Sequence, residues 1–284
     1  MKCFVCGSEM RDYFKKAMEA ETSEWNYVRC EHCGLVLCQT VYDMPSDEWQ
    51  MLNDRWEGGY QGRDENPDCD PNWLSRMYRQ ARLFADVTAS GLWEADAHIV
   101  DYGCGDGKLE DYMQHELSGS EGARTSAKEV CVPKILKYDK YMRPEGSGDY
   151  LEDEDVKPGT FDAVVCSAVF EHLRGRSNVE EIIGLLTDRG TFCLHTMVCE
   201  EVPLDPDWFY LLPVHCTMWT NKSMGIIYEQ YGFVGCAYHV EGRMWFFFRN
   251  RQRYELLRSK SPSIPGTWFF SDKFVDYWKQ KPYH

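Results

Sequence analysis

The sequence predicts an α/β protein built on a Rossmann-like sheet, with a small cysteine-rich unit in front of it. Three features support this prediction: an apolar strand that runs into a glycine-rich loop, an alternation of strand-like and helix-like segments as far as residue 220, and two Cys-x-x-Cys pairs near the start of the chain. With 284 residues, 43% of them hydrophobic, the chain is long enough to bury a full core and one smaller addition.

The cysteine pairs are Cys3 with Cys6 and Cys30 with Cys33; 23 residues separate them, and a glycine follows each pair. Each pair predicts a tight turn that points two sulfurs at one ion, and the spacing is typical of a four-thiolate zinc site. Four thiolates fill the coordination shell of zinc, so we expect a structural ion. The expected zinc ribbon covers residues 1–41.

The rest of the chain divides by composition. Residues 42–71 are acidic and rich in turn formers, which predicts a linker with a flap. A helical pattern that starts after Asn72 and stops at Gly91 opens the main domain, expected over residues 72–250. Residues 251–284 form an aromatic tail that we expect to dock on the core.

The central motif is the stretch Ile99 to Leu109, IVDYGCGDGKL. An apolar strand reaches Asp101, three alternating glycines follow, and an amphipathic helix resumes at Leu109. Glycines allow positive φ and let the backbone approach a ligand closely at the start of a helix. A dinucleotide-binding loop needs its third glycine one position later, where this chain has Lys108.

Later segments supply the remaining elements. A second strand is expected to end at Asp139, and the apolar run Phe161–Cys166 predicts a strand buried on both faces. Glu171-His172 then begins a helix, with His172 expected to pack or cap. Further along, the sequence predicts a helix over Val179–Leu186 that stops at Gly190, a strand over Thr191–Val198, a helix over Asn221–Tyr231 and a hairpin over Val234–Arg249.

The motifs DYGCGDG and FDAVVCSAVFEHL resemble the first and fourth-strand motifs of class I S-adenosylmethionine (SAM)-dependent methyltransferases. The resemblance covers about residues 72–250 and implies a seven-stranded methyltransferase sheet. It also implies that Asp139 accepts hydrogen bonds from the ribose hydroxyls and that Ser167 to Val169 line the methionine end of SAM. The cofactor-binding residues expected from the resemblance are Asp101, Gly103, Cys104, Gly105, Gly107, Asp139, Lys140, Ser167, Ala168 and Val169.

Two histidines are candidates for a catalytic base. His195 lies near the end of the fifth expected strand, and His215 lies in the following loop, which commonly forms a wall of the substrate site. The segment PVHCTMWT resembles a recurring P-x-H-x-x-x-(F/W)-(T/S) element of these enzymes. Histidine titrates near neutrality and suits deprotonation of a hydroxyl. We expect His215 or His195 in this role, with a reaction that uses no histidine base as the alternative.

The ribbon resembles small zinc ribbons that precede bacterial methyltransferases acting on sugars or other small molecules. We therefore expect SAM-dependent methyl transfer to a small molecule, in the first place to a sugar hydroxyl. The net charge of −15 argues against a nucleic-acid partner. No apolar run approaches the roughly 18 residues that span a bilayer, and the first residues lack the apolar stretch of a signal peptide, so we expect a cytoplasmic protein without a membrane partner.

Several alternatives stay open at this point. A nicotinamide-dependent oxidoreductase would share the Rossmann-like sheet, and a non-catalytic zinc-ribbon adaptor would share the whole architecture. A protein-directed methyltransferase would keep the chemistry and change the acceptor. The sequence also leaves open whether the methyl group goes to oxygen, carbon or nitrogen. It does not decide whether a divalent ion acts at the active site, or what the oligomeric state is.

Overall fold

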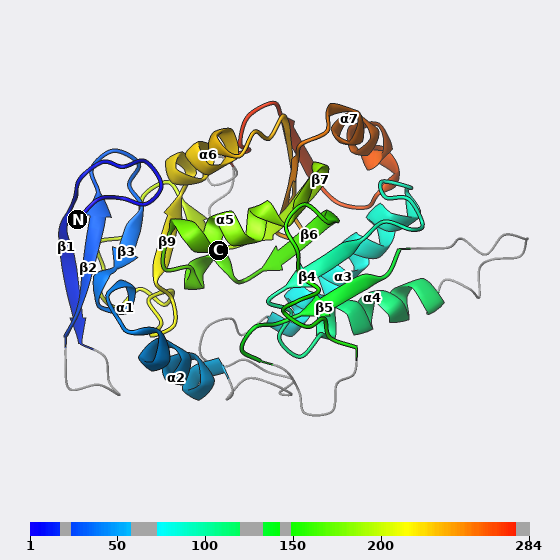
Figure 1. Ribbon diagram of the computed structural model, residues 1–284. Coiled ribbons are helices and arrows are strands. Elements are labelled where there is room, and N and C mark those ends of the chain that lie inside the picture. Colours follow the sequence, from blue (N-terminus) through cyan, green and yellow to red (C-terminus); the bar gives the residue numbers. More distant parts are fainter. Residues whose placement is uncertain (18–23, 58–72, 120–132, 143–148, 277–284) are drawn as a thin grey trace, which may run out of the picture.

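The structure, a computed structural model, describes residues 1–17, 24–57, 73–119, 133–142 and 149–276. Two β-sheets with helices around them make up these residues (Figure 1). Much of the expected flap within residues 42–71 falls outside the described residues, which stop at Glu57 and resume at Trp73.

The larger sheet has seven strands in the order β12-β10-β11-β7-β6-β4-β5. Strands β5, β4, β6 and β7 are parallel, and β11 joins β7 antiparallel. Parallel strands end at one edge of a sheet, which is where open α/β sheets bind ligands. The predicted Rossmann-like seven-stranded sheet is confirmed. Its strands are β4 (Ile99–Tyr102), β5 (Ile135–Tyr138), β6 (Phe161–Ser167), β7 (Leu186–His195), β10 (Gly235–His239), β11 (Met244–Phe248) and β12 (Trp268–Ser271).

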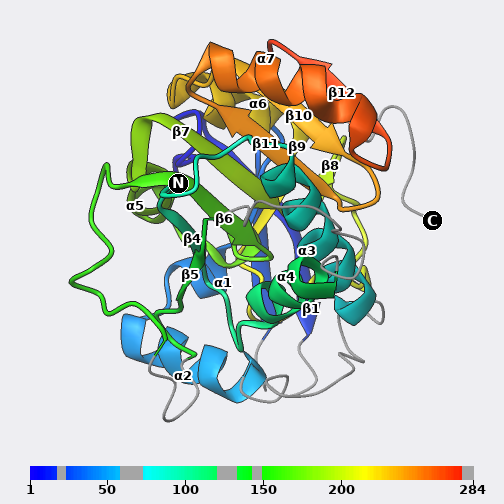
Figure 2. The same ribbon diagram turned by 90° about the vertical axis from the view of Figure 1, so that its right-hand side faces the viewer.

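Successive side chains of the central strands alternate between two apolar cores. Ile99 and Val165 face one core, where α3, α4 and α7 pack, whereas Val100 and Cys166 face the other, with α5 and α6 (Figure 2). Burial on both faces explains the continuous apolar runs of these strands. None of the helices in the described ranges has the length and apolar character to cross a bilayer. The helices are α3 (Trp73–Ala89), α4 (Lys108–Gly119), α5 (Arg176–Gly184), α6 (Asn221–Gln230) and α7 (Arg251–Lys260), with a 3-10 turn η3 at Ser261–Ser263.

The predicted boundary between α5 and β7 is wrong. The helix ends at Gly184, not at Gly190, and Leu186 already belongs to the strand. The cause is non-local: the backbone N–H groups of Gly159 and Thr160 donate to the carbonyls of Gly184 and Leu185, at 2.9 and 3.0 Å. These hydrogen bonds satisfy carbonyl groups at the end of the helix, so the helix stops there and β7 begins to pair with β6.

The predicted terminal hairpin is present as β10 and β11, which pair from Gly235 with Phe248 to His239 with Met244. The aromatic tail contributes more than the expected docking. Its residues Trp268–Ser271 form the edge strand β12, antiparallel to β10. At the opposite edge, Tyr150 extends the sheet by a single parallel bridge to Lys137.

The second sheet joins the N-terminal unit to the segment after β7. Its five strands have the order β1-β2-β3-β9-β8, and Val36 and Leu37 of β3 pair with Met218 and Thr217 of β9. The expected loop between residues 199 and 220 therefore ends as a strand of the N-terminal sheet. The elements are β1 (Met10–Ala17), β2 (Glu24–Cys30), β3 (Val36–Cys38), β8 (Val198–Cys199), β9 (Thr217–Thr220), and the helices α1 (Gln39–Tyr42) and α2 (Ser46–Glu57).

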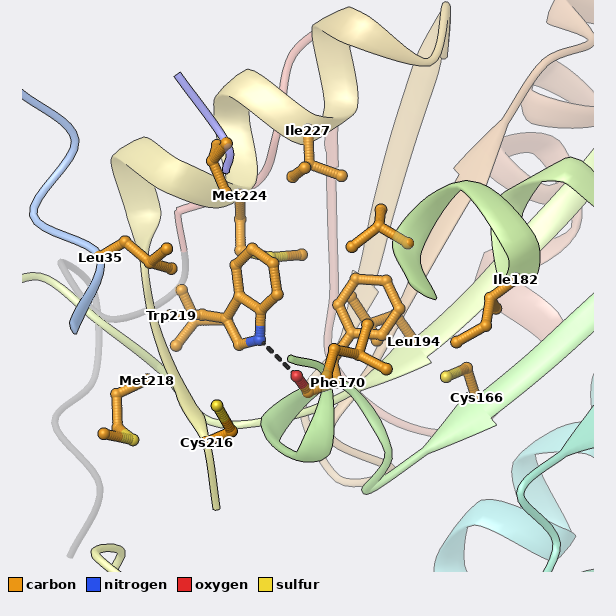
Figure 3. Packing of buried hydrophobic residues seen from close by; sticks show 14 of the residues in the cluster. Leu35, Cys166, Phe170, Ile182, Leu194, Cys216, Met218, Trp219, Met224 and Ile227 are labelled. Atoms are coloured by element: carbon orange, nitrogen blue, oxygen red, sulfur yellow. Dashed lines mark hydrogen bonds between the residues drawn. The ribbon is translucent and has the colours of Figure 1, made fainter. Parts of the chain in front are cut away.

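Trp219 of β9 fills the junction between the two sheets. Its fully buried ring lies between Leu35 of the N-terminal unit and the 3-10 turn η2 (Phe170–His172) (Figure 3). The indole Nε1–H donates to the carbonyl of Phe170 at 2.9 Å, and the ring of Phe4 packs edge-on at 5.9 Å. One side chain thus ties the N-terminal unit, β9 and η2 together.

We predict that Trp219→Ala lowers the free energy of unfolding by about 3–5 kcal/mol, because it empties a buried site and leaves the Phe170 carbonyl without its donor. Urea denaturation measures the change. Phe209→Ala is the matched control, since Phe209 is 56% exposed, and it should cost no more than about 0.5 kcal/mol. Equal effects of the two substitutions would contradict the role assigned to Trp219.

Candidate functional site

The glycine-rich loop after β4 is closed on one side and open on the other. Gly103, Gly105 and Gly107 all have positive φ, at 75°, 57° and 74°. A Cβ on Gly103 would lie 2.6 Å from Cγ2 of Val169, whereas a Cβ on Gly105 would meet nothing within 4 Å. The loop therefore packs against the segment after β6, and its open face at the start of α4 is accessible to a ligand.

Asp139, directly after β5, lies beside this loop. Its Oδ2 accepts the N–H of Gly105 at 2.9 Å, and its Oδ1 accepts the N–H groups of Tyr141 and Met142 at 2.9 and 2.8 Å. Burial raises the pKa of Asp139, and these backbone donors oppose the rise. The structure thus brings Asp139 and the glycine loop together. Lys140 is exposed, and its Nζ lies 3.8 Å from Oε1 of Glu181 on α5.

Two buried carboxyl groups lie below the loop. Asp101 is 2% exposed and Glu110 of α4 is 5% exposed. Burial raises the pKa of Asp101 to about 7, and burial together with the Asp101 charge raises that of Glu110 well above its usual value. Apart from each other, Oδ1 of Asp101 and both carboxyl oxygens of Glu110 have no hydrogen-bond partner among the described residues. Burial also raises the pKa of the Cys104 thiol. The two carboxyls resist simultaneous ionisation.

The residues after β6 form the next wall of the site. Ala168 has a φ of +60°, a conformation that costs a non-glycine residue about 1–3 kcal/mol and that clusters at functional sites. Its N–H donates to the carbonyl of His195 at 2.9 Å, which helps to hold it. Ser167 Oγ donates to Gln80 Oε1 at 2.8 Å and accepts from Arg76 Nη1 at 3.1 Å.

Arg76 and Gln80 escaped the sequence analysis. Both lie on α3 and both are buried. The two residues are one helical turn apart on an otherwise apolar face of α3. This spacing could have indicated a shared buried partner, because buried polar side chains need hydrogen bonds.

His195 and His215 share one hydrogen-bonding pattern. The Nδ1–H of His195 donates to the carbonyl of Arg243 at 2.7 Å, and that of His215 to the carbonyl of Tyr210 at 2.8 Å, because a carbonyl only accepts. Burial and nearby Arg76 lower the pKa of His195 to about 3, and burial and nearby His172 lower that of His215 to about 4. Each ring is neutral at pH 7, with an unprotonated Nε2.

Glu171 adds an acid that the sequence analysis did not assign. Its Oε1 accepts the Tyr210 hydroxyl at 2.8 Å and its Oε2 accepts the Thr196 hydroxyl at 3.0 Å. Burial alone would raise its pKa, but neighbouring His172 and His215 more than offset this, so the pKa lies below its usual value. The ring of His172 lies edge-on to the ring of His215, with the two centroids 5.1 Å apart.

The four N-terminal cysteines converge on one point. The sulfurs of Cys3 and Cys33 are 3.7 Å apart, those of Cys6 and Cys30 are 3.4 Å apart, and all four lie within 4.8 Å of one another. A tetrahedral zinc ion with Zn–S bonds of 2.3 Å would place its sulfurs about 3.8 Å apart. The donor set and its size fit a closed structural zinc site.

A family profile described as "Methyltransferase domain" matches residues 75–237, more than half of the chain. No curated protein matches.

Similar solved structures include two SAM-dependent methyltransferases of microbial origin. The one from Thermotoga maritima, described as a possible histamine N-methyltransferase, has 12% identity and a TM-score of 0.36, over 71% of this chain and 100% of that one. The one from Archaeoglobus fulgidus has 16% identity and a TM-score of 0.38, over 66% and 76%. The plantazolicin methyltransferase, solved with SAH, has 10% identity and a TM-score of 0.40, over 75% and 93%.

We predict that Asp101→Asn changes how stability depends on pH. The folded-state pKa of Asp101, about 7, lies above its unfolded value near 4, so the folded state binds more protons between these values. This group therefore makes the free energy of unfolding fall as pH rises from 5 to 8. Removing it should raise the stability of the variant relative to wild type with increasing pH, by up to about 1.4 kcal/mol per unit.

Urea unfolding at pH 5.5, 6.5 and 7.5 measures the difference between variant and wild type. The exposed Glu229 provides the control, and Glu229→Gln should change the free energy of unfolding by no more than about 0.5 kcal/mol. A constant difference for Asp101→Asn would show that Asp101 titrates as an ordinary carboxyl.

Proposed function

The chain belongs to the family of methyltransferase domains, and from this membership we propose that it moves a methyl group from SAM to a hydroxyl of a small molecule, in the first place a sugar or sugar-derived metabolite. The family supports an enzyme over a non-catalytic adaptor. The acidic net charge of −15 supports a small-molecule acceptor over a nucleic acid.

The observation that carries the proposal is the open glycine loop beside a buried strand-end acid. A ligand can reach the backbone at Gly105, where a Cβ would meet nothing within 4 Å. Asp139 keeps one lone pair, on Oδ2, for a hydroxyl donor after its three backbone contacts are made. We propose that the cofactor is held by Asp101, Gly103, Cys104, Gly105, Gly107, Asp139, Lys140, Ser167, Ala168 and Val169.

The bound cofactor supplies a methyl group on a cationic sulfonium, so the chain's residues need to orient the acceptor and accept its proton. The Nε2 atoms of His195 and His215 are unprotonated and can each accept a proton, with a basicity that burial lowers. Trp208, Phe209 and Tyr210 form a cluster of rings with centroids within 6.1 Å of one another, and Phe209 is exposed. Such rings provide a stacking face for an acceptor.

Cys3, Cys6, Cys30 and Cys33 hold a structural zinc ion in this proposal. The site lies next to β9: the Thr220 hydroxyl donates to the carbonyl of Cys33 at 2.6 Å, and Lys222 donates to that of His32. Zinc would thereby stiffen the strand that follows His215.

We predict that Asp139→Ala weakens binding of S-adenosylhomocysteine at least about tenfold, because the ribose loses a charged hydrogen-bond acceptor. Isothermal titration measures the dissociation constant. Asp111→Ala on the exposed side of α4 is the control and should bind like wild type. Unchanged binding in Asp139→Ala would remove this residue from the cofactor site.

The reaction is tested with labelled SAM and a panel of sugars, nucleotide sugars, small amines and peptides. We predict transfer to a hydroxyl-bearing sugar compound. His195→Ala should lower kcat about 100-fold or more and leave S-adenosylhomocysteine binding unchanged, as expected for loss of a proton acceptor. Transfer only to amines or peptides would contradict the acceptor class.

Cys30→Ser should lose one zinc ion per chain, measured by elemental analysis, and should unfold at a lower temperature, because a four-thiolate site contributes to folding. Cys199→Ser, at a buried cysteine outside the four-sulfur site, is the control and should keep its zinc. Full zinc content in Cys30→Ser would refute the assignment.

A further inference from the structure

A second group of potential metal ligands lies at the carboxyl ends of β6 and β7. Glu171 and His172 of η2 and His215 each offer one ligand atom, and these atoms lie within 4.8 Å of one another. Phe170 and Cys216, their sequence neighbours, are drawn in Figure 3 beside Trp219. One carboxylate with two imidazoles is a donor set that suits divalent transition metals.

Hydrogen bonds from outside the group orient two of its members. The Nδ1–H of His215 donates to the carbonyl of Tyr210, which leaves the Nε2 lone pair free to bind a metal. The hydroxyls of Tyr210 and Thr196 hold the two carboxylate oxygens of Glu171. Metal-binding histidines and carboxylates in proteins are oriented by outer hydrogen bonds of this kind.

The charge balance of the group also indicates a cation. Glu171 is 3% exposed and His215 is 5% exposed. Within the described ranges no lysine or arginine is paired with Glu171; its neighbours are two hydroxyl donors and two imidazoles, and a bound cation would add the compensating charge that a buried carboxylate needs. The ring of His172 has no hydrogen-bond partner among the described residues and faces the His215 ring.

The group lies beside the proposed methyl-transfer site. Val169, which packs against Gly103 of the glycine loop, directly precedes η2. Thr196, which binds Glu171, directly follows His195. The same edge of the sheet therefore carries the cofactor loop, the candidate proton acceptor and the Glu-His-His group.

We infer that Glu171, His172 and His215 bind a divalent transition-metal ion that holds the acceptor oxygen for methyl transfer. This inference rests on the proposed function and deepens it. Three protein ligands leave coordination positions open for an oxygen, and a metal-bound hydroxyl loses its proton more readily. In this arrangement His215 is a metal ligand, and His195 remains as the proton acceptor.

The step balances without a redox change. The acceptor oxygen forms the new C–O bond with its lone pair as the methyl C–S bond breaks, and the bond's electrons stay on sulfur, which gives S-adenosylhomocysteine. The hydroxyl proton passes to Nε2 of His195, and the ion keeps its charge.

Cobalt titration of the full chain, stripped of metal with a chelator, distinguishes this site from the cysteine site. Cobalt bound by thiolates gives a strong sulfur-to-cobalt charge-transfer band, whereas cobalt bound by imidazole and carboxylate gives only weak visible bands. We expect two cobalt ions per chain. His172→Ala should lose the ion without the charge-transfer band, and Tyr210→Phe, which keeps all three ligands, should weaken it about 10–100-fold.

The exposed His115 of α4 provides the control, and His115→Ala should bind both ions. Binding of one cobalt ion only, at the thiolates, would overturn the inference, as would a second ion retained unchanged in both His172→Ala and Tyr210→Phe. Titration of S-adenosylhomocysteine into the same samples tests the proposed function separately. Cofactor binding without a second metal would leave the methyltransferase proposal standing and refute the metal site.

Discussion

The hydrogen bond from the Trp219 indole to the Phe170 carbonyl is the contact on which the candidate site depends. Phe170 directly precedes Glu171 and His172, and Trp219 belongs to the strand that follows His215. Pairing of β9 with β3 extends this contact to the N-terminal unit. The N-terminal unit is therefore connected through β9 to the turn that carries Glu171 and His172.

Buried carboxyl groups give the ligand edge of the sheet its electrostatic character. Asp101, Glu110, Asp139 and Glu171 are all buried there. Burial raises the pKa of the first three, so a ligand that brings positive charge would favour their ionised forms. A cationic sulfonium at the glycine loop and a divalent ion at Glu171 would each supply it. The proposed cofactor and the inferred metal would thus both place positive charge beside buried carboxyl groups.

The sequence predicted the elements whose conformation depends on residues close together in the chain. The glycine loop, the hairpin and the apolar strand β6 depend on short-range conformation and on burial of neighbouring side chains, and the sequence shows both. The end of α5 at Gly184 depends on donors from Gly159 and Thr160, and β12 depends on pairing with β10. The residues of α5 and of β12 therefore give no sign of these distant partners. The Glu171 cluster unites residues 44 positions apart, from Glu171 to His215, so spacing alone could not reveal it.

The thermal unfolding temperature, measured with SAM, S-adenosylhomocysteine and NAD in parallel, tests the central claim most directly. A ligand at a hundredfold excess over its dissociation constant stabilises the folded state by about 2.7 kcal/mol, which is a shift of a few degrees for a chain of this size. We expect this rise with SAM and with S-adenosylhomocysteine, and none with NAD. A rise with NAD alone, or none with any of the three, would contradict it.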